Sequence, residues 1–268
     1  MSDVVTIEKN DHIAHVKLNR PEKLNALNAE MFTAIVDAGK TVAADTAVRV
    51  VVLSGEGRGF CAGLDFGSFM AMGEGGENKE FSFFEKPENN PANYAQLVGY
   101  IWKQVPVPVI AAVHGVAFGG GLQLALAADI RLAGRDARFS VMEIKWGLVP
   151  DMSGTQTLRD LVRLDVAKEM TYTGRIVEAE EAAELGLVTR LCADPLAEAL
   201  EMAAGIAGKS PDAIVAGKQL LDNAWHGGAA EGLALEASLQ RKIIAQENQV
   251  EAVLANFEKR APNFKERK

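Results

Sequence analysis

Three consecutive glycines at positions 119–121 constrain this chain more than any other feature of its sequence. They separate an apolar run, VHGVAF, from a second apolar run, LQLALAAD, in which the apolar residues have helical spacing. A helix N-terminus exposes unpaired backbone N–H groups with partial positive charge, and residues without side chains let an anionic oxygen approach them. The glycines therefore fit a backbone anion site, and close packing of a helix on a strand is an equal alternative.

A second turn of small residues, FCAGLDF, lies about fifty residues earlier in the chain. It follows a predicted strand and also joins it to the next element through small residues, Ala62 and Gly63. Two backbone N–H groups from separate turns, aimed at one point, would form an oxyanion hole. Loss of one such donor typically costs about 2.7–4 kcal/mol of transition-state stabilisation.

The composition restricts the class of protein. With 268 residues, of which 48% are hydrophobic and 24% charged, the chain can bury a large core without disulfide or metal staples. Its net charge of −8 argues against nucleic-acid binding. Two cysteines, Cys61 and Cys192, form no framework and favour a reducing, cytoplasmic compartment. The sequence shows no signal peptide and no apolar run of the roughly 20 residues that a membrane span needs.

The order of predicted elements indicates an α/β core followed by helices. Residues 4–18 read as a hairpin around a turn at Lys9, Asn10 and Asp11. Predicted helices cover residues 27–45, with Asn28 as cap, 94–105, 158–174 and 178–188, the last ending at Gly186. Predicted strands cover 48–57, 106–113 and two short segments within 129–141. Strands and helices alternate up to about residue 200, and residues 201–268 are mostly helical in the same structural unit.

Several features of the helical C-terminal part are specific enough to test. Pro211 after Ser210 is typical of a helix start. Val250, Val253, Leu254 and Phe257 form an apolar stripe with helical spacing.

Several enzyme classes are excluded by missing motifs. The glycines at 55, 57, 59 and 63 miss the G-x-G-x-x-G spacing of dinucleotide binding, and no P-loop or G-x-S-x-G elbow occurs. The histidines have no metal-ligand spacing, so we expect no metal site. His12 and His15 fit cross-strand roles in the first hairpin, and His114 a structural role after a buried strand.

Residues 71–91 are the most irregular part of the chain, rich in Gly, Asn and Glu around Phe81, Phe83 and Phe84. A surface insertion is the first interpretation of this composition. A lid over a ligand is the alternative, because three phenylalanines need an apolar surface to contact.

Taken together, FCAGLDF, HGVAFGGGLQLALAADIRLAG and ARFSVMEIKWGLVPDMSGTQ resemble the crotonase superfamily, also called the enoyl-CoA hydratase/isomerase family. The resemblance extends from RPEKLNAL to FEKRAPNFK. It implies a spiral of ββα units with a helical C-terminal region that forms homotrimers or dimers of trimers. It also implies an acyl-CoA thioester as substrate, so that coenzyme A enters with the substrate and no separate cofactor is needed.

The same resemblance assigns the oxyanion hole. Its two donors would be the backbone N–H groups of Leu64 and Gly120, each preceded by a glycine, Gly63 and Gly119. Asp65 would fix the first of these turns through an Asx-type hydrogen bond.

The acid and base positions decide which reaction is favoured. Hydratases of the family use two glutamates, and the matching positions here are Gln123 and Glu143. Glutamine cannot exchange a proton at neutral pH and only forms hydrogen bonds. Glu143 is therefore the expected base. Burial near Trp146 and Leu148 would raise the pKa of one of two carboxylates, Glu143 or Asp151. The alternative for Glu143 is an ordinary surface glutamate.

Asp151 is the second candidate carboxylate. Dienoyl-CoA isomerases of the family carry an aspartate at the matching place, and family dehalogenases use it as a nucleophile. Asp151 could equally cap the helix that begins near SGTQTLRDL. Asp151 and Glu143 together suit a proton shuttle, so double-bond isomerisation is the favoured reaction. Hydration is the close alternative. Dehalogenation or thioester hydrolysis, with Asp151 as nucleophile, is the third possible reaction. An RNA-binding relative is the non-enzymatic alternative, disfavoured by the acidic charge.

The resemblance also places the coenzyme A moiety. Backbone groups of Asn25, Ala26 and Ala62 would contact the adenine or pantetheine, and Lys23 a phosphate. Lys265 could reach a phosphate in a neighbouring subunit. For both lysines a solvated surface charge is the alternative.

Overall fold

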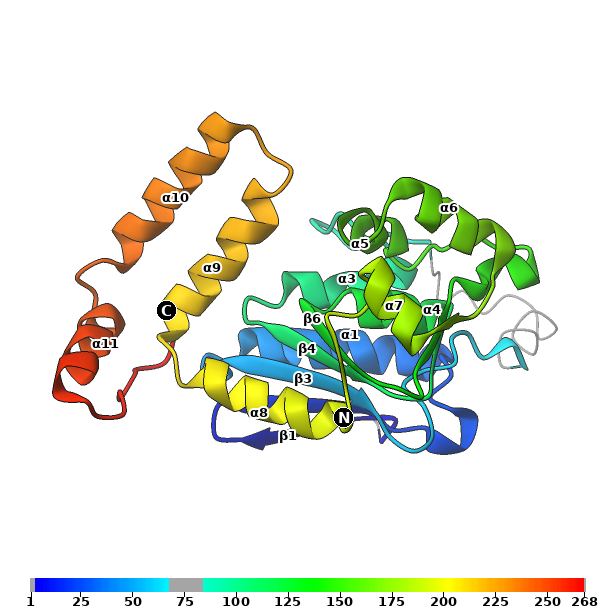
Figure 1. Cartoon of the computed structure of the whole chain (residues 1–268), viewed down its shortest axis with the longest axis horizontal. Helices are drawn as coiled ribbons and strands as arrows, with labels where there is room; N and C mark the ends of the chain where they lie inside the picture. The colour runs from blue at the N-terminus through cyan, green and yellow to red at the C-terminus, as the bar shows by residue number, and fades with distance from the viewer. Residues whose placement is uncertain (1–2, 68–83, 268) are drawn as a thin grey trace.

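The computed structural model describes residues 3–67 and 84–267 (Figure 1). Its main sheet has the strand order β1-β2-β3-β4-β6-β9. These strands are β1 (Val5–Asn10), β2 (Ile13–Leu18), β3 (Val50–Gly55), β4 (Val109–Val113), β6 (Ile130–Gly134) and β9 (Arg190–Cys192). Strands β1 and β2 form the predicted antiparallel hairpin, and every later pairing in this sheet is parallel.

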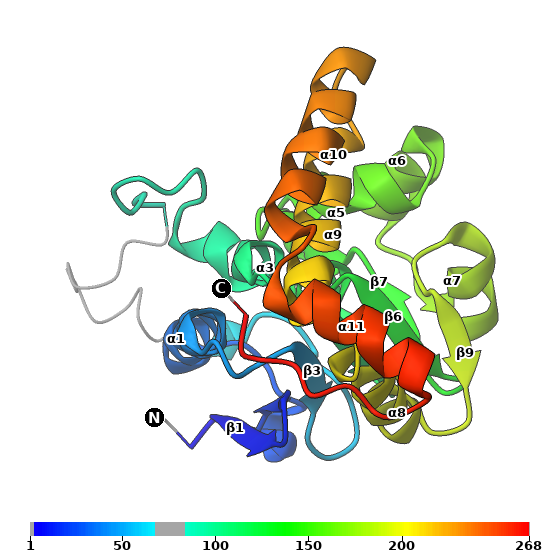
Figure 2. The ribbon, with the colours of Figure 1, turned by 90° about the vertical axis from the view of Figure 1, so that its left-hand side faces the viewer.

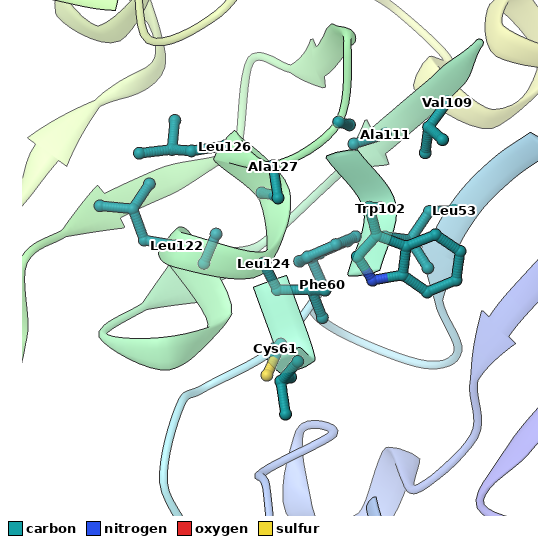
Figure 3. Packing of buried hydrophobic residues seen from close by; sticks show 14 of the residues in the cluster. Leu53, Phe60, Cys61, Trp102, Val109, Ala111, Leu122, Leu124, Leu126 and Ala127 are labelled. Atoms are coloured by element: carbon teal, nitrogen blue, oxygen red, sulfur yellow. The ribbon is translucent and has the colours of Figure 1, made fainter. Parts of the chain in front are cut away.

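Helices cover both faces of the main sheet. Along β3, Val51 and Leu53 join a core with α1 (Ala29–Ala44), α3 (Tyr94–Gln104) and α4 (Gly120–Leu126). Val50 and Val52 alternate with them and pack on α8 (Pro195–Ala207) on the other face. Such double coverage explains why β3 and β4 read as continuous apolar runs rather than alternating ones. Figure 3 shows the first core, in which Leu53, Trp102 and Leu124 lie close together.

A second, smaller sheet confirms the predicted ββα spiral. It has the order β5-β7-β8, from β5 (Val116–Phe118), β7 (Arg138–Ser140) and β8 (Val177–Glu178). The consecutive strands β4 and β5 contribute one strand to each sheet, and so do β6 and β7. Of the three consecutive glycines, Gly119 links β5 to α4, and Gly120 and Gly121 are the first two residues of α4.

Most predicted helix boundaries are confirmed by their caps. The side chain of Asn28 accepts a hydrogen bond from the Met31 backbone N–H at 2.9 Å. Helix α7 (Ala179–Leu185) ends at Gly186 in a left-handed conformation. Helix α9 (Pro211–Ala224) begins at Pro211 as the Ser-Pro pair predicts, although Ser210 Oγ has no hydrogen-bond partner among the described residues.

The prediction of one helix over residues 158–174 is wrong. The segment contains the end of α5 (Gly154–Leu161) and all of α6 (Leu164–Thr173), with Val162 and Arg163 in extended conformations between them. The break changes the direction of the chain. It lets Leu158 and Met170, one on each helix, both become buried in the main core.

The C-terminal helices extend away from the sheets and the tail returns to them. Helix α9 is followed by α10 (Ala229–Ile243), which packs beside it, and by α11 (Glu247–Glu258) (Figures 1 and 2). Arg267 then donates hydrogen bonds to the carbonyl oxygens of Ala43, Asp45 and Val48 next to α1. Position 201, where the helical region was predicted to begin, falls inside α8, which packs on the main sheet.

The predicted apolar stripe is helical and exposed in the single chain. It lies on α11, and its four members, Val250, Val253, Leu254 and Phe257, are all exposed. Assembly of the helical C-terminal region with other subunits stays a prediction. Within residues 3–67 and 84–267, no helix has both the length and the apolar character to cross a bilayer.

Asn25 holds together the loops that precede the first small-residue turn. It is fully buried with φ at +55°, and its Nδ2 donates to the carbonyl oxygens of Glu56 and Gly59, each at 2.9 Å. We expect Asn25→Ala to lower the free energy of unfolding by about 2–3 kcal/mol, because buried carbonyl oxygens would lose their donor. Chemical denaturation measures this loss.

The matched control is Asn89→Ala. Asn89 also has a left-handed conformation, with φ at +63°, but it is exposed. We expect this variant to lose less than about 1 kcal/mol, because only the backbone preference changes. Equal losses in the two variants would contradict the role of the buried hydrogen bonds.

Candidate active site

One apolar cavity of about 350 Å³ lies where the two small-residue turns meet. The turns, α1, α3 and the segment after β7 all contribute to its wall. Its lining residues are Phe32, Ala62, Gly63, Leu64, Phe66, Phe84, Ala95, Gly119, Gly120, Met142, Glu143, Trp146, Leu148, Asp151 and Met152. A larger and more polar cleft of about 640 Å³ between α3, α5 and α9 contains none of the predicted site residues.

In the first turn, the backbone N–H of Leu64 points away from the residue with which Leu64 pairs. Leu64 forms an isolated parallel bridge with Leu27. The bonds of this bridge run from Leu27 N–H to Gly63 O at 2.7 Å and from Asp65 N–H to Leu27 O at 3.0 Å. In such a bridge the residue between the two bonded neighbours turns its own N–H to the opposite side. The hydrogen bonds between described residues include no acceptor for the Leu64 N–H.

The second turn presents the Gly120 amide in the same way. Gly120 is the first residue of α4, and the first N–H groups of a helix have no intrahelical acceptor. A Cβ atom added at Gly63 would lie 2.6 Å from Phe118 O and 3.5 Å from Gly120 N, so the two turns touch through Gly63. Close packing also explains one member of the triple glycine, because a Cβ added at Gly121 would overlap Cys61 O. The anion-site interpretation of the triple glycine stays a prediction.

Glu143 is the buried carboxylate of the cavity. It lies in the 3₁₀ helix η2 (Met142–Trp146) and is only 9% exposed, which excludes the surface alternative. Its Oε1 accepts a hydrogen bond of 2.6 Å from Gln123 Nε2, while its Oε2 is buried without a partner among the described residues. Burial raises the pKa of Glu143 above the ordinary value, the Asp151 charge adds to this, and hydrogen bonding to Gln123 acts against it.

Gln123 has a role that the sequence did not reveal. It is 2% exposed, and its Oε1 accepts two backbone hydrogen bonds of 2.8 Å, from Met152 and Gly154. A Cβ added at Gly154 would lie 2.6 Å from this oxygen, so Gly154 has to be a glycine for the loop to come so close. Gly154 is thus a signal in the sequence, but only the structure shows which side chain it accommodates.

Asp151 lines the cavity and is not a helix cap. Helix α5 begins at Gly154, its N-cap residue is Ser153 in a left-handed conformation, and no side chain caps it. The capping interpretation of Asp151 is therefore wrong, because the helix starts too late. Asp151 remains more exposed than Glu143, and partial burial raises its pKa.

Trp146 and Leu148 are exposed, at 50% and 47%, although they were expected to help bury one of the two carboxylates. Trp146 instead stacks on Phe66, with ring centroids 3.9 Å apart. Phe84, the one member of the phenylalanine island within the described residues, also lines the cavity and is 78% exposed. Phe81 and Phe83 lie outside the described residues.

The residues predicted to hold coenzyme A are not all available. The N–H of Asn25 donates to Arg20 O at 2.9 Å and that of Ala26 to Lys23 O at 3.0 Å, so both N–H groups already have backbone acceptors. The Ala62 N–H is likewise bonded, to Leu24 O. These contacts follow from the tight turn around residues 20–27.

The charged members of the predicted set lie outside the cavity lining. Lys23 and Lys265 are exposed, and their phosphate contacts stay predictions. Asp65 accepts a hydrogen bond from Arg20 Nη1 at 2.8 Å, and the same nitrogen donates to Ala26 O at 2.9 Å. Asp65 therefore ties the first small-residue turn to the loop around residue 20.

Three of the histidines contact other segments of the fold, and of His12 and His15 only His15 has the expected cross-strand contact. His12 Nδ1 lies 2.9 Å from Ala47 O, His15 Nε2 lies 2.8 Å from Ser54 Oγ, and His114 Nε2 lies 2.9 Å from Gly57 O. No group of three or more potential metal ligands occurs in residues 3–67 and 84–267.

Known proteins match the chain over nearly its whole length. The profile of the family "Enoyl-CoA hydratase/isomerase" matches residues 8–267. The chain is 33% identical to the 2,3-dehydroadipyl-CoA hydratase of Escherichia coli, with 100% of both chains covered. It is 32% identical to the crotonyl-CoA hydratase of Syntrophomonas wolfei, with 97% of both covered.

Solved structures agree with these relatives. An enoyl-CoA hydratase from Bacillus anthracis superposes with a TM-score of 0.87 at 29% identity, covering 98% of this chain and 99% of its own. An enoyl-CoA hydratase from Mycobacterium tuberculosis superposes with a TM-score of 0.84 at 30% identity, with 98% and 99% covered. The chain is thus an enzyme that belongs to the enoyl-CoA hydratase/isomerase family, the crotonase superfamily.

Proposed function

We propose that this enzyme moves a carbon–carbon double bond in an acyl-CoA thioester, with Glu143 as its base. One observation carries the proposal: Glu143 Oε2 is buried, with no partner among the described residues, in the wall of the cavity that Leu64 and Gly120 also line. A buried carboxylate oxygen without a partner carries a large desolvation cost, so a reacting proton is its natural partner.

The reaction follows from these three groups. Ionised Glu143 takes a proton from a carbon activated by the thioester carbonyl, and the electron pair moves to the carbonyl oxygen. The N–H groups of Leu64 and Gly120 stabilise the resulting enolate by hydrogen bonding. The proton then returns to a different carbon of the acyl chain, from Glu143 itself or from Asp151, whose raised pKa suits proton delivery. The double bond has then moved. When Glu143 returns the proton, its starting state is restored at once. When Asp151 delivers the proton, Glu143 is left protonated and Asp151 ionised, and a proton has to pass from Glu143 to Asp151 before the next turnover.

Hydration is the second candidate, because relatives that match the whole chain are named hydratases. It would require Glu143 to activate a water molecule without help from a second acid at position 123. Gln123 already donates to Glu143 and cannot exchange a proton. This difference from a two-glutamate site favours isomerisation.

A panel of thioesters in deuterated water separates these reactions. We expect 3-enoyl-CoA to be converted into 2-enoyl-CoA, with deuterium entering the acyl chain, faster than 2-enoyl-CoA is converted into 3-hydroxyacyl-CoA. Faster hydration would favour the second candidate. Release of free coenzyme A, or a covalent acyl adduct on Asp151, would instead support hydrolytic or nucleophilic chemistry.

The cavity wall indicates an uncharged, apolar acyl group. Its charged lining residues within the described chain, Glu143 and Asp151, are both acidic, and the remaining side chains are apolar. An acyl group with a second carboxylate would meet like charge without a described cation to pair with it. We therefore expect 2,3-dehydroadipyl-CoA to be a poor substrate.

Trp146→Ala tests the apolar wall. Its ring stacks on Phe66, and both rings line the cavity. We expect kcat/KM to fall about 10-fold for an acyl group of eight carbons, which is long enough to contact the rings, and by less than about 3-fold for a four-carbon group. Equal losses for both chain lengths would show that the ring supports the fold and not the acyl group.

A further inference from the structure

Gln123 lies at a junction of three elements, each of which carries part of the candidate site. It belongs to α4, directly after the glycines, and it contacts Glu143 in η2 and the loop that follows Asp151. It is 2% exposed, and all its described side-chain hydrogen bonds go to these two segments. A buried amide with this arrangement of partners determines the relative positions of the two carboxylates.

The orientation of the Gln123 amide is fixed by its partners. Two backbone N–H groups, from Met152 and Gly154, can only donate, so the atom facing them has to be the amide oxygen. The amide nitrogen then faces Glu143 Oε1 at 2.6 Å and can only donate to it. The polarity of the hydrogen bond to Glu143 is therefore set by the backbone of the loop.

We infer that Gln123 is a positioning residue, whose amide occupies one oxygen of Glu143 and leaves the other as the reactive atom. The inference rests on the proposed role of Glu143 as base. The donated N–H stabilises the ionised carboxylate and restricts its rotation, so Oε2 faces the substrate in the charged form. Through Met152 and Gly154 the same amide holds the loop that carries Asp151.

The charges around Glu143 leave this hydrogen bond as the main stabilising contact from another side chain. Among the described residues, the charge that acts on Glu143 from a different element is Asp151, which disfavours ionisation. Lys145, on the same 3₁₀ helix, lies over the Trp146 ring at 5.5 Å from its centroid. Burial and Asp151 therefore oppose the charged form, whereas the backbone N–H of Glu143 itself and the Gln123 amide support it.

Gln123→Met is the first test, because methionine has a similar length and no hydrogen-bonding amide. We expect kcat to fall about 10–100-fold with KM changed less than about 3-fold, and the acid limb of the kcat/KM profile to move upward by about one pH unit. Carbon-13 NMR or infrared titration of the Glu143 carboxyl, identified by its loss in Glu143→Gln, reports the same shift without turnover. An unchanged titration of Glu143 would overturn the inference even if the enzyme proved inactive on every thioester.

Gln123→Glu is the second test and keeps the shape of the side chain. The introduced carboxyl group can accept from the loop and donate to Glu143 while it is protonated, whereas its ionised form would repel Glu143. We expect the two carboxyls to titrate as a coupled pair, so that activity falls on the alkaline side as well as on the acid side. An alkaline limb identical to that of the unmodified enzyme would count against the inference.

Thr157→Val is the matched control. Thr157 Oγ1 donates to Gly154 O at 3.1 Å within the first turn of α5, so this substitution weakens the helix start that adjoins the loop without touching Glu143. We expect it to lower the melting temperature and to leave the titration of Glu143 in place. If Thr157→Val and Gln123→Met shifted that titration equally, Gln123 would only support the fold of the loop.

Discussion

Replacement of Glu143 by glutamine is expected to abolish turnover, with kcat reduced by about 10²–10⁴-fold or more, because the substrate proton loses its acceptor. Glutamine keeps the size of the side chain and its Oε1 can still accept from Gln123, so the cavity should retain its shape. Binding of the CoA ester, measured by calorimetry, should therefore change little. Turnover within about 3-fold of the unmodified enzyme would exclude Glu143 as the base.

The same substitution should stabilise the fold at neutral pH. Burial raises the folded-state pKa of Glu143 above its unfolded value. The stability that this group contributes is therefore fully present below the unfolded pKa and is lost as the pH rises through the folded pKa. Glutamine never ionises, so we expect Glu143→Gln to raise the melting temperature at about pH 7 and to have a smaller effect near about pH 4. The opposite pattern would mean that the ionised carboxylate is stabilised by a partner in the fold.

The raised pKa of Glu143 also determines how kcat/KM of the unmodified enzyme depends on pH. Since the base has to be ionised, kcat/KM should fall as the pH drops through a value above the usual range of a glutamate pKa. The melting temperature of Glu143→Gln, measured across the same pH range, lacks the contribution of the Glu143 titration. Comparing it with the melting temperature of the unmodified enzyme separates the loss of activity from unfolding.

Gly63→Ala is expected to have the second large effect, a loss of about 10²–10³-fold in kcat/KM, by moving the two oxyanion donors apart. Gly63 has φ at +87°, and an added Cβ would lie 2.6 Å from Phe118 O. Neither backbone can yield without changing the distance between the Leu64 and Gly120 amides. Steady-state kinetics with the best thioester of the panel measures the loss.

Gly186→Ala separates this effect from strain alone. Gly186 has φ at +92°, and its added Cβ would lie 2.5 Å from another backbone oxygen, that of Leu161. It ends α7 and takes no part in the cavity lining. Both variants should lose similar stability in denaturation experiments, and only Gly63→Ala should also lose turnover in the remaining folded enzyme. Similar turnover in the two variants would argue against an oxyanion hole between these turns.

The local structure could be predicted because each signal lies within a few residues of the element that it specifies. Asn28 caps the helix it precedes, Pro211 begins a helix, and Gly186 ends one. The buried strands β3 and β4 were recognisable from their apolar runs. The prediction of a single helix over residues 158–174 failed because the break at Val162 serves distant packing, which periodicity does not report.

Position in the sequence also indicated which carboxylates are candidates for acid–base catalysis. It could not indicate which groups surround them. The motifs identify Glu143 and Asp151 as candidates, and the cavity contains both. The capping interpretation of Asp151 was reasonable for an Asp-x-Ser-Gly turn and is wrong only because α5 begins at Gly154. The bond from Gln123 to Glu143 joins residues twenty positions apart, on elements whose contact depends on both sheets.

The amino-acid sequence by itself determined the α/β core followed by helices, the family and the residues that can carry charge, because periodicity, capping and motif spacing act over short stretches of chain. The ββα spiral was expected only from the family resemblance, since the short strands β5, β8 and β9 have no clear local signal. The tertiary structure alone decided which amide N–H groups stay unbonded among the described residues, which oxygen of Glu143 lacks a partner there, and which pKa values rise. These properties depend on burial and on hydrogen-bond partners from distant segments, and both arise only when the two sheets and α4 pack together.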